Sequence, residues 1–257
     1  MFARRMLASL VVSIAALPAM LGGCEPTDRL PDLRVGELYG FSVQRTASGR
    51  ALLRFGTIGF NVGAGPLEAR GVRTDTDSGS MLVTQRIYDS EGGHRDRRTS
   101  AVMVYDTGDN HDHWHTRQFM TVTMYRLGNP TGNVYGLRKL GYCLLDAERM
   151  SNPPPNSPDT RQYPNGSCGN RSSTSVRTGL SIGYGDDYPP QYAHQWMDVN
   201  RLPLGTYRIC ATVDPFGDFV ESRDDNNQRW ADVRVNVRAG TVQVLDTAVG
   251  RCGPNVS

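Results

Sequence analysis

Short apolar stretches broken by turn residues are the feature that most constrains the fold of this 257-residue chain. Within residues 229–237, for example, Ala231, Val233 and Val235 alternate with polar residues, so they share one face of a β-strand. Clusters of Gly, Pro, Asn and Asp separate such stretches, and no long window keeps a helical period. The sequence therefore predicts an all-β fold, an antiparallel β-sandwich with long loops.

The strands are expected where the alternation is clearest. The expected segments are residues 51–61, 81–88, 101–105, 113–127, 134–145, 195–199, 207–213, 229–237 and 242–249. Residues 146–175 contain a triple proline and are expected to form a long loop. No internal repeat or linker divides the chain, so residues 24–257 are expected to be a single domain.

Composition excludes several classes of protein. With 28 Gly, 15 Pro and 38% hydrophobic residues, the chain is unlike a coiled coil, a collagen, a disordered tail or a multi-span membrane protein. A formal net charge of +2 without a basic block argues against nucleic acid as a partner. Oligomeric state has no signature in the sequence.

The first 23 residues read as a lipoprotein-type signal peptide. Arg4 and Arg5 precede an uncharged apolar run over residues 6–21, which is shorter than the roughly 20 residues that span a bilayer. A Leu-Gly-Gly sequence before Cys24 resembles the bacterial lipobox, in which the cysteine becomes the lipidated first residue. The alternative is an ordinary cleaved signal. We expect an exported protein of the bacterial cell envelope, either secreted or anchored through Cys24 at the periplasmic face or cell surface.

Export places the remaining four cysteines in an oxidising compartment. They allow three pairings. We expect Cys143–Cys168 and Cys210–Cys252 because each closes a local segment, although the sequence leaves the other pairings open. The chain contains no Cys-x-x-Cys motif, which argues against a thiolate metal site or a thioredoxin-like redox site.

Three of the five histidines, His111, His113 and His115, lie at a spacing of two. In a strand, their side chains would project from one face within about 7 Å of each other. Imidazole is a common ligand of copper and zinc, so the pattern predicts a metal site. The alternative is a polar strand face. The absence of acids from residues 116–134 disfavours a cupin-type site, and no His-Glu-x-x-His motif is present.

The histidine segment is similar to the copper-binding His-x-His-x-His segment of the lysyl oxidase family. Residues 138–143 resemble the segment that carries the family's cofactor lysine, and residues 179–198 resemble the segment of its cofactor tyrosine. Further similar segments are residues 30–33, 53–55, 203–207 and 221–227. The resemblance therefore extends over residues 30–237 in order and spacing.

The resemblance implies copper held by His111, His113 and His115, and a lysine tyrosylquinone cofactor formed from Lys139 and Tyr188. Of 28 basic residues, Lys139 is the single lysine and the other 27 are arginines. An arginine cannot replace it, because a guanidinium stays protonated and adds poorly to a quinone. A GC-rich genome would explain the excess of arginine but not the position of the one lysine.

Tyr184 and Tyr192 are rival candidates for the cofactor tyrosine. We favour Tyr188, because it lies eight residues before Trp196, as the family pattern requires. The implied reaction is that of a copper-dependent amine oxidase of the protein-lysine 6-oxidase type. It converts a primary amine or peptidyl lysine to an aldehyde and releases hydrogen peroxide and ammonia.

A general base would remove a proton from the substrate carbon. Asp186, Asp187 and His194 are the candidates, and His194 stands where animal members of the family carry a cysteine. The acids near the histidine segment would suit a cationic substrate or serve as turn residues. These acids are Asp106, Asp109 and Asp112.

The resemblance also implies a possible calcium site, since oxygen-rich loops suit this hard cation. The matching groups are Asp32, the carbonyl of Leu33, Glu221, Asn226 and Asn227. Arg223 replaces an acidic ligand, for which Asp224 or Asp225 would have to compensate. The alternative is a polar turn between two strands.

Two other functions fit the same residues. The first is a non-catalytic copper-binding or adhesion-type surface lipoprotein. The second is a zinc-dependent hydrolase built on the three histidines, although no positioned glutamate accompanies them.

Overall fold

The computed structural model describes residues 26–107, 112–128 and 134–252. These residues form strands and loops without a helix, and every strand pairing is antiparallel. The predicted all-β class is confirmed. No helix in these ranges is long and apolar enough to cross a membrane. Cys24 and His111 lie outside the described residues.

The strands follow the chain as β1 (Asp28–Arg29), β2 (Leu33–Val35), β3 (Tyr39–Arg45), β4 (Ala51–Asn61), β5 (Leu67–Val72), β6 (Ser80–Asp89), β7 (His94–Asp106), β8 (His113–Arg126), β9 (Val134–Tyr142), β10 (Glu148–Arg149), β11 (Ser175–Leu180), β12 (Tyr184–Tyr188), β13 (Trp196–Asp198), β14 (Gly205–Val213), β15 (Gln228–Asn236) and β16 (Thr241–Val249).

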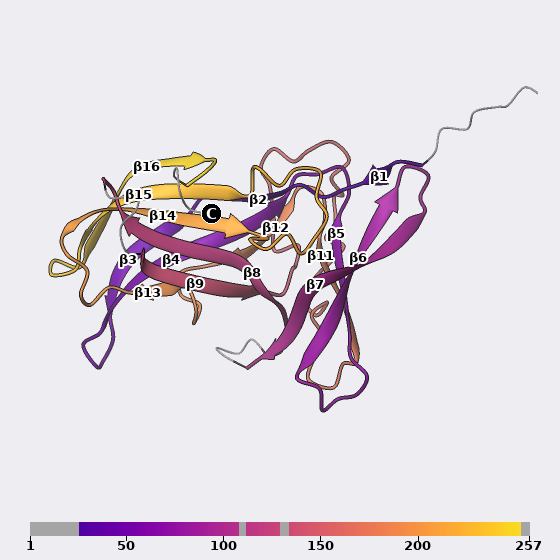
Figure 1. Ribbon diagram of the computed structural model, residues 1–257, viewed down its shortest axis with the longest axis horizontal. Coiled ribbons are helices and arrows are strands. Elements are labelled where there is room, and N and C mark those ends of the chain that lie inside the picture. The colour runs from indigo at the N-terminus through magenta and orange to yellow at the C-terminus, as the bar shows by residue number, and fades with distance from the viewer. Residues whose placement is uncertain (1–25, 108–111, 129–133, 253–257) are drawn as a thin grey trace, which may run out of the picture.

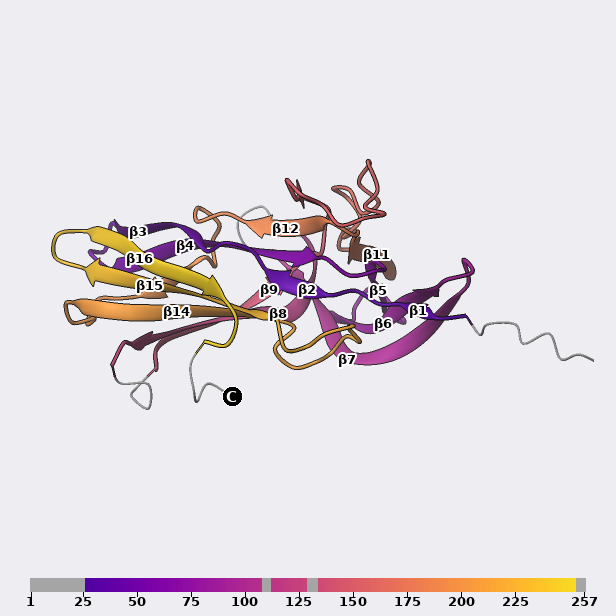
Figure 2. The same cartoon turned by 90° about the horizontal axis from the view of Figure 1, so that it is seen from above.

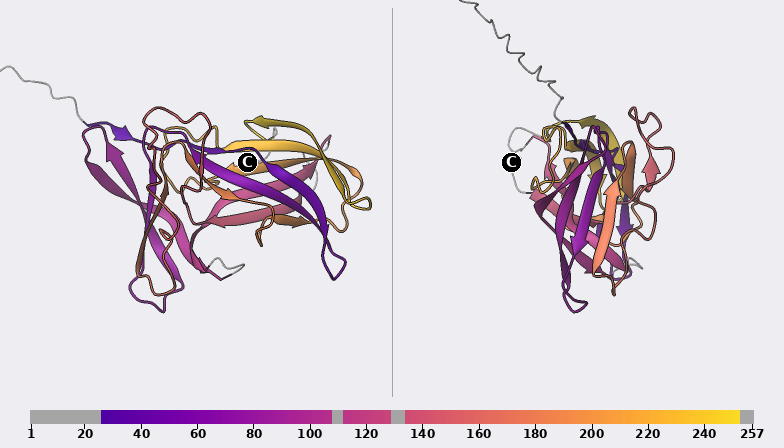
Figure 3. Two further views of the ribbon diagram at one scale, coloured as in Figure 1. Left: turned by 180° about the vertical axis from the view of Figure 1, so that it is seen from behind. Right: turned by 90° about the vertical axis from the view of Figure 1, so that its right-hand side faces the viewer.

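Two sheets pack face to face. The larger has the order β11-β5-β6-β7-β8-β14-β15-β16, with β1 beside β6 and β9 beside β8 (Figure 1). The smaller is centred on β4, which pairs with β12, β13, β2 and β3, while β10 pairs with β12. Seen from above, β3, β4 and β12 form one layer and β14 and β15 the other (Figure 2). The steep strands β5, β6, β7 and β11 extend the larger sheet beyond the sandwich (Figure 3).

Each expected segment contains a strand, and β4 has the expected bounds. The prediction omitted β1, β2, β3, β5, β10, β11 and β12. Several of these are short, and β12 carries Asp186 and Asp187 in sequence, which are unfavourable strand residues. Pairing with β4 makes them a strand despite that composition.

Both sheets contribute to one core. Leu53 and Phe55 of β4 belong to the same buried cluster as Val122 of β8 and Ile209 of β14. Ala231, Val233 and Val235 are fully buried, as their alternation predicts.

The cysteines lie in two pairs at disulfide distance. The Cα atoms of Cys143 and Cys168 are 5.8 Å apart, and those of Cys210 and Cys252 are 5.7 Å apart. Both pairs agree with the expected pairing. The first ties the loop after β9 back to the end of that strand.

Glu68 of β5 is a buried carboxylate that joins several strands. Arg70 and Arg177 pair with it at 2.7 and 2.9 Å, and the hydroxyls of Tyr88 and Tyr163 each donate to it at 2.9 Å. Burial alone would raise the pKa of Glu68. Hydrogen bonds from these four partners outweigh burial and hold the pKa below its ordinary value.

We expect Glu68→Gln to lower the free energy of unfolding by about 3 kcal/mol at pH 7, because two arginines lose their partner. A lowered folded-state pKa stabilises the protein above the ordinary pKa of 4.5, and this stabilisation is lost as the pH falls through the folded-state pKa. The difference between variant and wild type should therefore shrink below pH 4.5 in denaturant titrations. Glu91→Gln, at an exposed turn, is the matched control. A pH-independent difference would contradict the prediction.

Candidate functional site

The start of β8 presents imidazoles on one face. His113 and His115 alternate with Trp114, and their ring centroids lie 4.6 Å apart. Trp114 is buried, its Nε1 donates to the carbonyl of Asn170 at 2.9 Å, and the Arg73 guanidinium stacks 4.6 Å from its ring. The buried indole fixes the strand's orientation, so its two neighbours turn to the other face.

Two adjacent imidazoles are donors that suit copper. The third expected ligand, His111, is outside the described residues. In the part of the chain that the structure describes, no cluster of three or more His, Cys, Asp or Glu residues could hold a metal ion. The two described residues of the expected three-histidine donor set are thus chemically suited to copper, and His111 would have to complete the set.

Tyr188, the last residue of β12, lies beside this face. Its ring centroid is 6.2 Å from that of His115 and 4.0 Å from that of Tyr142, at a tilt of 31°. Its hydroxyl accepts a hydrogen bond from the Cys143 N–H at 3.1 Å. Burial, reinforced by the nearby Asp186 carboxylate, holds the pKa of Tyr188 well above its ordinary value, so the phenol is protonated.

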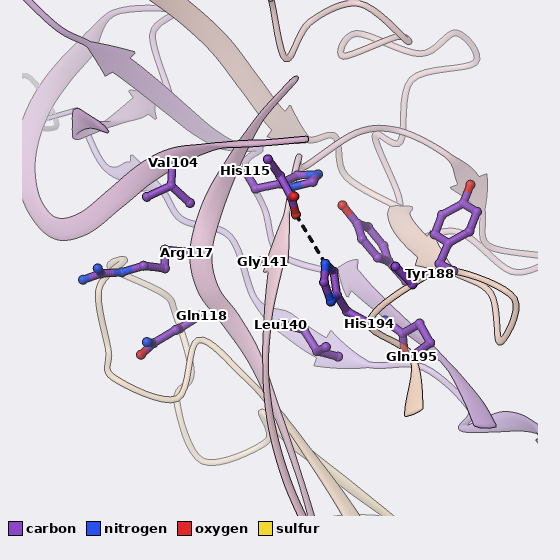
Figure 4. A pocket seen from close by; sticks show the side chains of 12 residues that line it. Val104, His115, Arg117, Gln118, Leu140, Gly141, Tyr188, His194 and Gln195 are labelled. Carbon is purple, nitrogen blue, oxygen red and sulfur yellow. Dashed lines mark ion pairs between the residues drawn. The ribbon is translucent and has the colours of Figure 1, made fainter. Parts of the chain in front are cut away.

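A cavity of about 250 Å³ is lined by both His115 of β8 and Tyr188 of β12. Figure 4 shows His115, Tyr188, Gly141 and His194 among the residues that line it. A Cβ at Gly141 would lie 3.3 Å from the His115 Cβ, so glycine lets β9 approach β8 closely here.

Lys139 precedes Gly141 by two residues in β9, and its backbone is in register with Thr121 of β8. This places the lysine's strand beside the histidine strand. Its side chain is outside the described part of the structure.

The rival tyrosines differ in position. Tyr192 lines the same cavity, and its ring centroid is 5.7 Å from that of Tyr188. Tyr184 pairs with Arg149 at the other end of β12 and is not among the lining residues.

The three candidate bases have different surroundings. The Asp186 carboxylate accepts the Leu144 N–H at 3.0 Å, and burial raises its pKa to about 8. Asp187 accepts the Tyr39 hydroxyl at 2.6 Å. Both acids line a second cavity, which His113 and Tyr188 also line.

His194 is the candidate that lines the cavity of His115. Its Nε2 is 3.7 Å from the Asp106 carboxylate, the ion pair marked by the dashed line in Figure 4. Asp106 ends β7, and the same carboxylate oxygen lies 3.4 Å from His115 Nδ1.

A polar chain behind Tyr188 was not anticipated from the sequence. The hydroxyls of Tyr142 and Thr57 lie 2.5 Å apart, and Thr57 donates to Gln195 Oε1 at 3.2 Å. Gln195 is fully buried and lines the cavity, and its Nε2 has no hydrogen-bond partner among the described residues. Gln195 precedes Trp196 in the segment that resembles the family's cofactor-tyrosine segment, and this was a sequence signal for Gln195. No sequence motif marks Thr57.

The expected calcium ligands meet at one place. Asn226 Nδ2 donates to Asp32 at 2.7 Å and Asn227 Nδ2 to Glu221 at 2.8 Å, while the Leu33 N–H donates to Glu221 at 2.6 Å. All four side chains that would bind are at least nine-tenths buried. Burial raises the pKa of Glu221 to about 8 despite these hydrogen bonds.

Two oxygens in this cluster suit a hard cation. The Oδ1 atoms of Asn226 and Asn227 are buried and have no hydrogen-bond partner within the described ranges. Arg223 is exposed and pairs with the exposed Asp225 at 3.1 Å. The donor set therefore fits calcium.

Comparison with known proteins identifies the family. The lysyl oxidase family model matches residues 103–245, more than half of the chain. The chain belongs to the lysyl oxidase family. No curated protein matches it. The matched range includes the three histidines, Lys139 and Tyr188. Membership in the lysyl oxidase family supports a copper-dependent amine oxidase, and hence an oxidoreductase, at the family level.

Proposed function

We propose that this protein is a copper-dependent amine oxidase of the protein-lysine 6-oxidase type. It converts a primary amine or peptidyl lysine to an aldehyde and releases hydrogen peroxide and ammonia. The observation that supports this best is the packing of Tyr188 beside His115 at one cavity, 6.2 Å between ring centroids. The family match is independent support.

In this proposal His111, His113 and His115 hold copper, and Lys139 and Tyr188 form the lysine tyrosylquinone. Once formed, the quinone supplies a carbonyl that accepts the amine and its electrons, a chemistry that no ordinary side chain provides. The residues around Tyr188 would hold its ring and its oxygen in position. Tyr142 packs against its ring, and the Cys143 N–H binds its oxygen.

His194 is our choice for the general base. It lines the cavity with His115 and Tyr188, and an imidazole can accept a proton near neutral pH. Asp186 and Asp187 are engaged by Leu144 N–H and the Tyr39 hydroxyl.

We also propose that the protein is exported and that Cys24 carries a lipid anchor, with residues 24–257 as one domain. The uncharged apolar run before Cys24 supports this location. Export would bring the enzyme into contact with amines or lysine-containing polymers outside the cytoplasm.

Two tyrosine variants, Tyr188→Phe and Tyr192→Phe, test the cofactor assignment together with Lys139→Arg. Purified mature protein reconstituted with copper in air should show a visible quinone band, phenylhydrazine labelling of Tyr188 and amine-dependent peroxide. Tyr188→Phe and Lys139→Arg should abolish all three, because the quinone needs this phenol and a primary amine. Tyr192→Phe, the neighbouring ring in the same cavity, should retain them.

Full amine oxidation by Lys139→Arg would refute the cofactor assignment. A wild-type protein that binds copper but shows neither band nor peroxide would be the non-catalytic copper-binding or adhesion-type lipoprotein instead.

His194→Gln tests the base. We expect amine-dependent peroxide release to fall by about 10²- to 10⁴-fold, the usual contribution of a general base. The quinone band and phenylhydrazine adduct should persist, because His194 is not needed to form the cofactor. Unchanged turnover in steady-state kinetics would return the assignment to Asp186 or Asp187.

We further propose that Asp32, the carbonyl of Leu33, Glu221, Asn226 and Asn227 bind calcium. The two buried amide oxygens support this, because such acceptors are costly to leave without a partner. The bound ion would join the chain before β2 to the loop before β15.

Calcium at 100 times its dissociation constant should stabilise the protein by about 2.7 kcal/mol, a rise of about 5–10 °C in the melting temperature. Glu221→Gln should lose most of this rise, because it removes the buried charge that binds the ion. Asp225→Asn, which changes an exposed acid in the same loop, should keep it. Equal calcium responses in scanning calorimetry for both variants would contradict the proposal.

A further inference from the structure

The Asp106 carboxylate lies close to two histidines of the candidate site. Asp106 is the last residue of β7, and its Oδ2 lies 3.4 Å from His115 Nδ1 and 3.7 Å from His194 Nε2. The register places Asp106 opposite His113, so it reaches His115 diagonally across the strand pair. The His115 imidazole is almost completely buried, at 3% exposure.

We propose that Asp106 is a positioning residue for copper. It holds Nδ1 of His115 towards its own carboxylate, which leaves Nε2 as the nitrogen directed to the metal. A carboxylate in this position fixes the tautomer and ring orientation of a metal-binding histidine and increases its basicity as a ligand. This inference rests on the proposed function in taking copper as the metal that His115 binds.

Neighbouring contacts hold Asp106 in place. The Tyr105 ring packs edge-on against Trp114, with centroids 5.5 Å apart, and its hydroxyl donates to the Asp112 carbonyl at 2.8 Å. The end of β7 is therefore attached to β8 immediately before Asp106. This fixes the backbone from which the Asp106 side chain reaches His115.

The same carboxylate connects the segment that follows Tyr188. The His194 side chain contacts Asp106, and the His194 backbone carbonyl accepts a hydrogen bond from Arg138 Nε at 3.4 Å. Arg138 in turn stacks on Trp196, 4.3 Å from the ring centroid. Asp106 thus joins the histidine strand to the tyrosine segment, while Arg138 joins that segment to the strand of Lys139.

Copper affinity tests the inference without relying on turnover. In chelator competition with the mature full-length protein at constant pH, Asp106→Asn should bind Cu(II) about 10- to 100-fold more weakly than wild type. Its copper hyperfine splitting in electron paramagnetic resonance should change, because the His115 ring is no longer held in one orientation. Asp106→Glu, which restores the charge one methylene further out, should recover only part of the affinity and give a spectrum between those of Asp106→Asn and wild type.

Asp112→Asn is the matched control, since it removes one negative charge beside His113 from an exposed position. We expect its effect on affinity to be at most about fivefold, as for an exposed charge. Equal weakening by both variants would mean that only overall charge matters and would overturn the inference. A wild-type affinity and spectrum in Asp106→Asn would overturn it as well.

The metal-free variants should keep the wild-type melting temperature, which separates positioning from folding. If Asp106→Asn unfolds, the spectrum and affinity of Asp106→Glu decide: values equal to those of wild type would overturn a role that depends on the carboxylate's position. Failure of the wild-type protein to bind Cu(II) would instead refute the proposed function itself.

Discussion

The burial of Trp114 is the constraint on which the site depends. Its indole packs under Arg73 and donates to Asn170, so it has one place in the fold. Because side chains alternate along a strand, the histidines on either side must face the opposite direction. Pairing of β8 with β7, β9 and β14 then determines which groups surround those histidines.

The tyrosine half of the site comes from the other sheet. Tyr188 reaches His115 because β12 pairs with β4, whose apolar side chains form the core with β8. The distance between the two rings is therefore set by packing between sheets rather than by a local motif. The cofactor proposed for Lys139 and Tyr188 would need this rigidity, since its two precursors must meet before a bond forms.

Local pattern was sufficient for the larger strands and for the shared face of His113 and His115. It predicted β4 with its bounds and the buried face of β15, and it favoured the two observed cysteine pairs while leaving the other pairings open. It missed β12, because consecutive aspartates are poor strand residues and only the pairing with β4 compensates. Thr57, and the contact of Asp106 with His115, depend on contacts between distant segments, which spacing along the chain does not report.

The Cys143–Cys168 pair touches both halves of the site through its backbone. The Cys143 N–H binds the Tyr188 oxygen, and the Cys168 carbonyl accepts the N–H of Trp114 at 3.1 Å. A disulfide between these cysteines therefore links the peptide group that contacts the Tyr188 hydroxyl to the strand that carries the histidines. In a chain whose two thiols stay reduced, this covalent link between the two halves of the site would be missing.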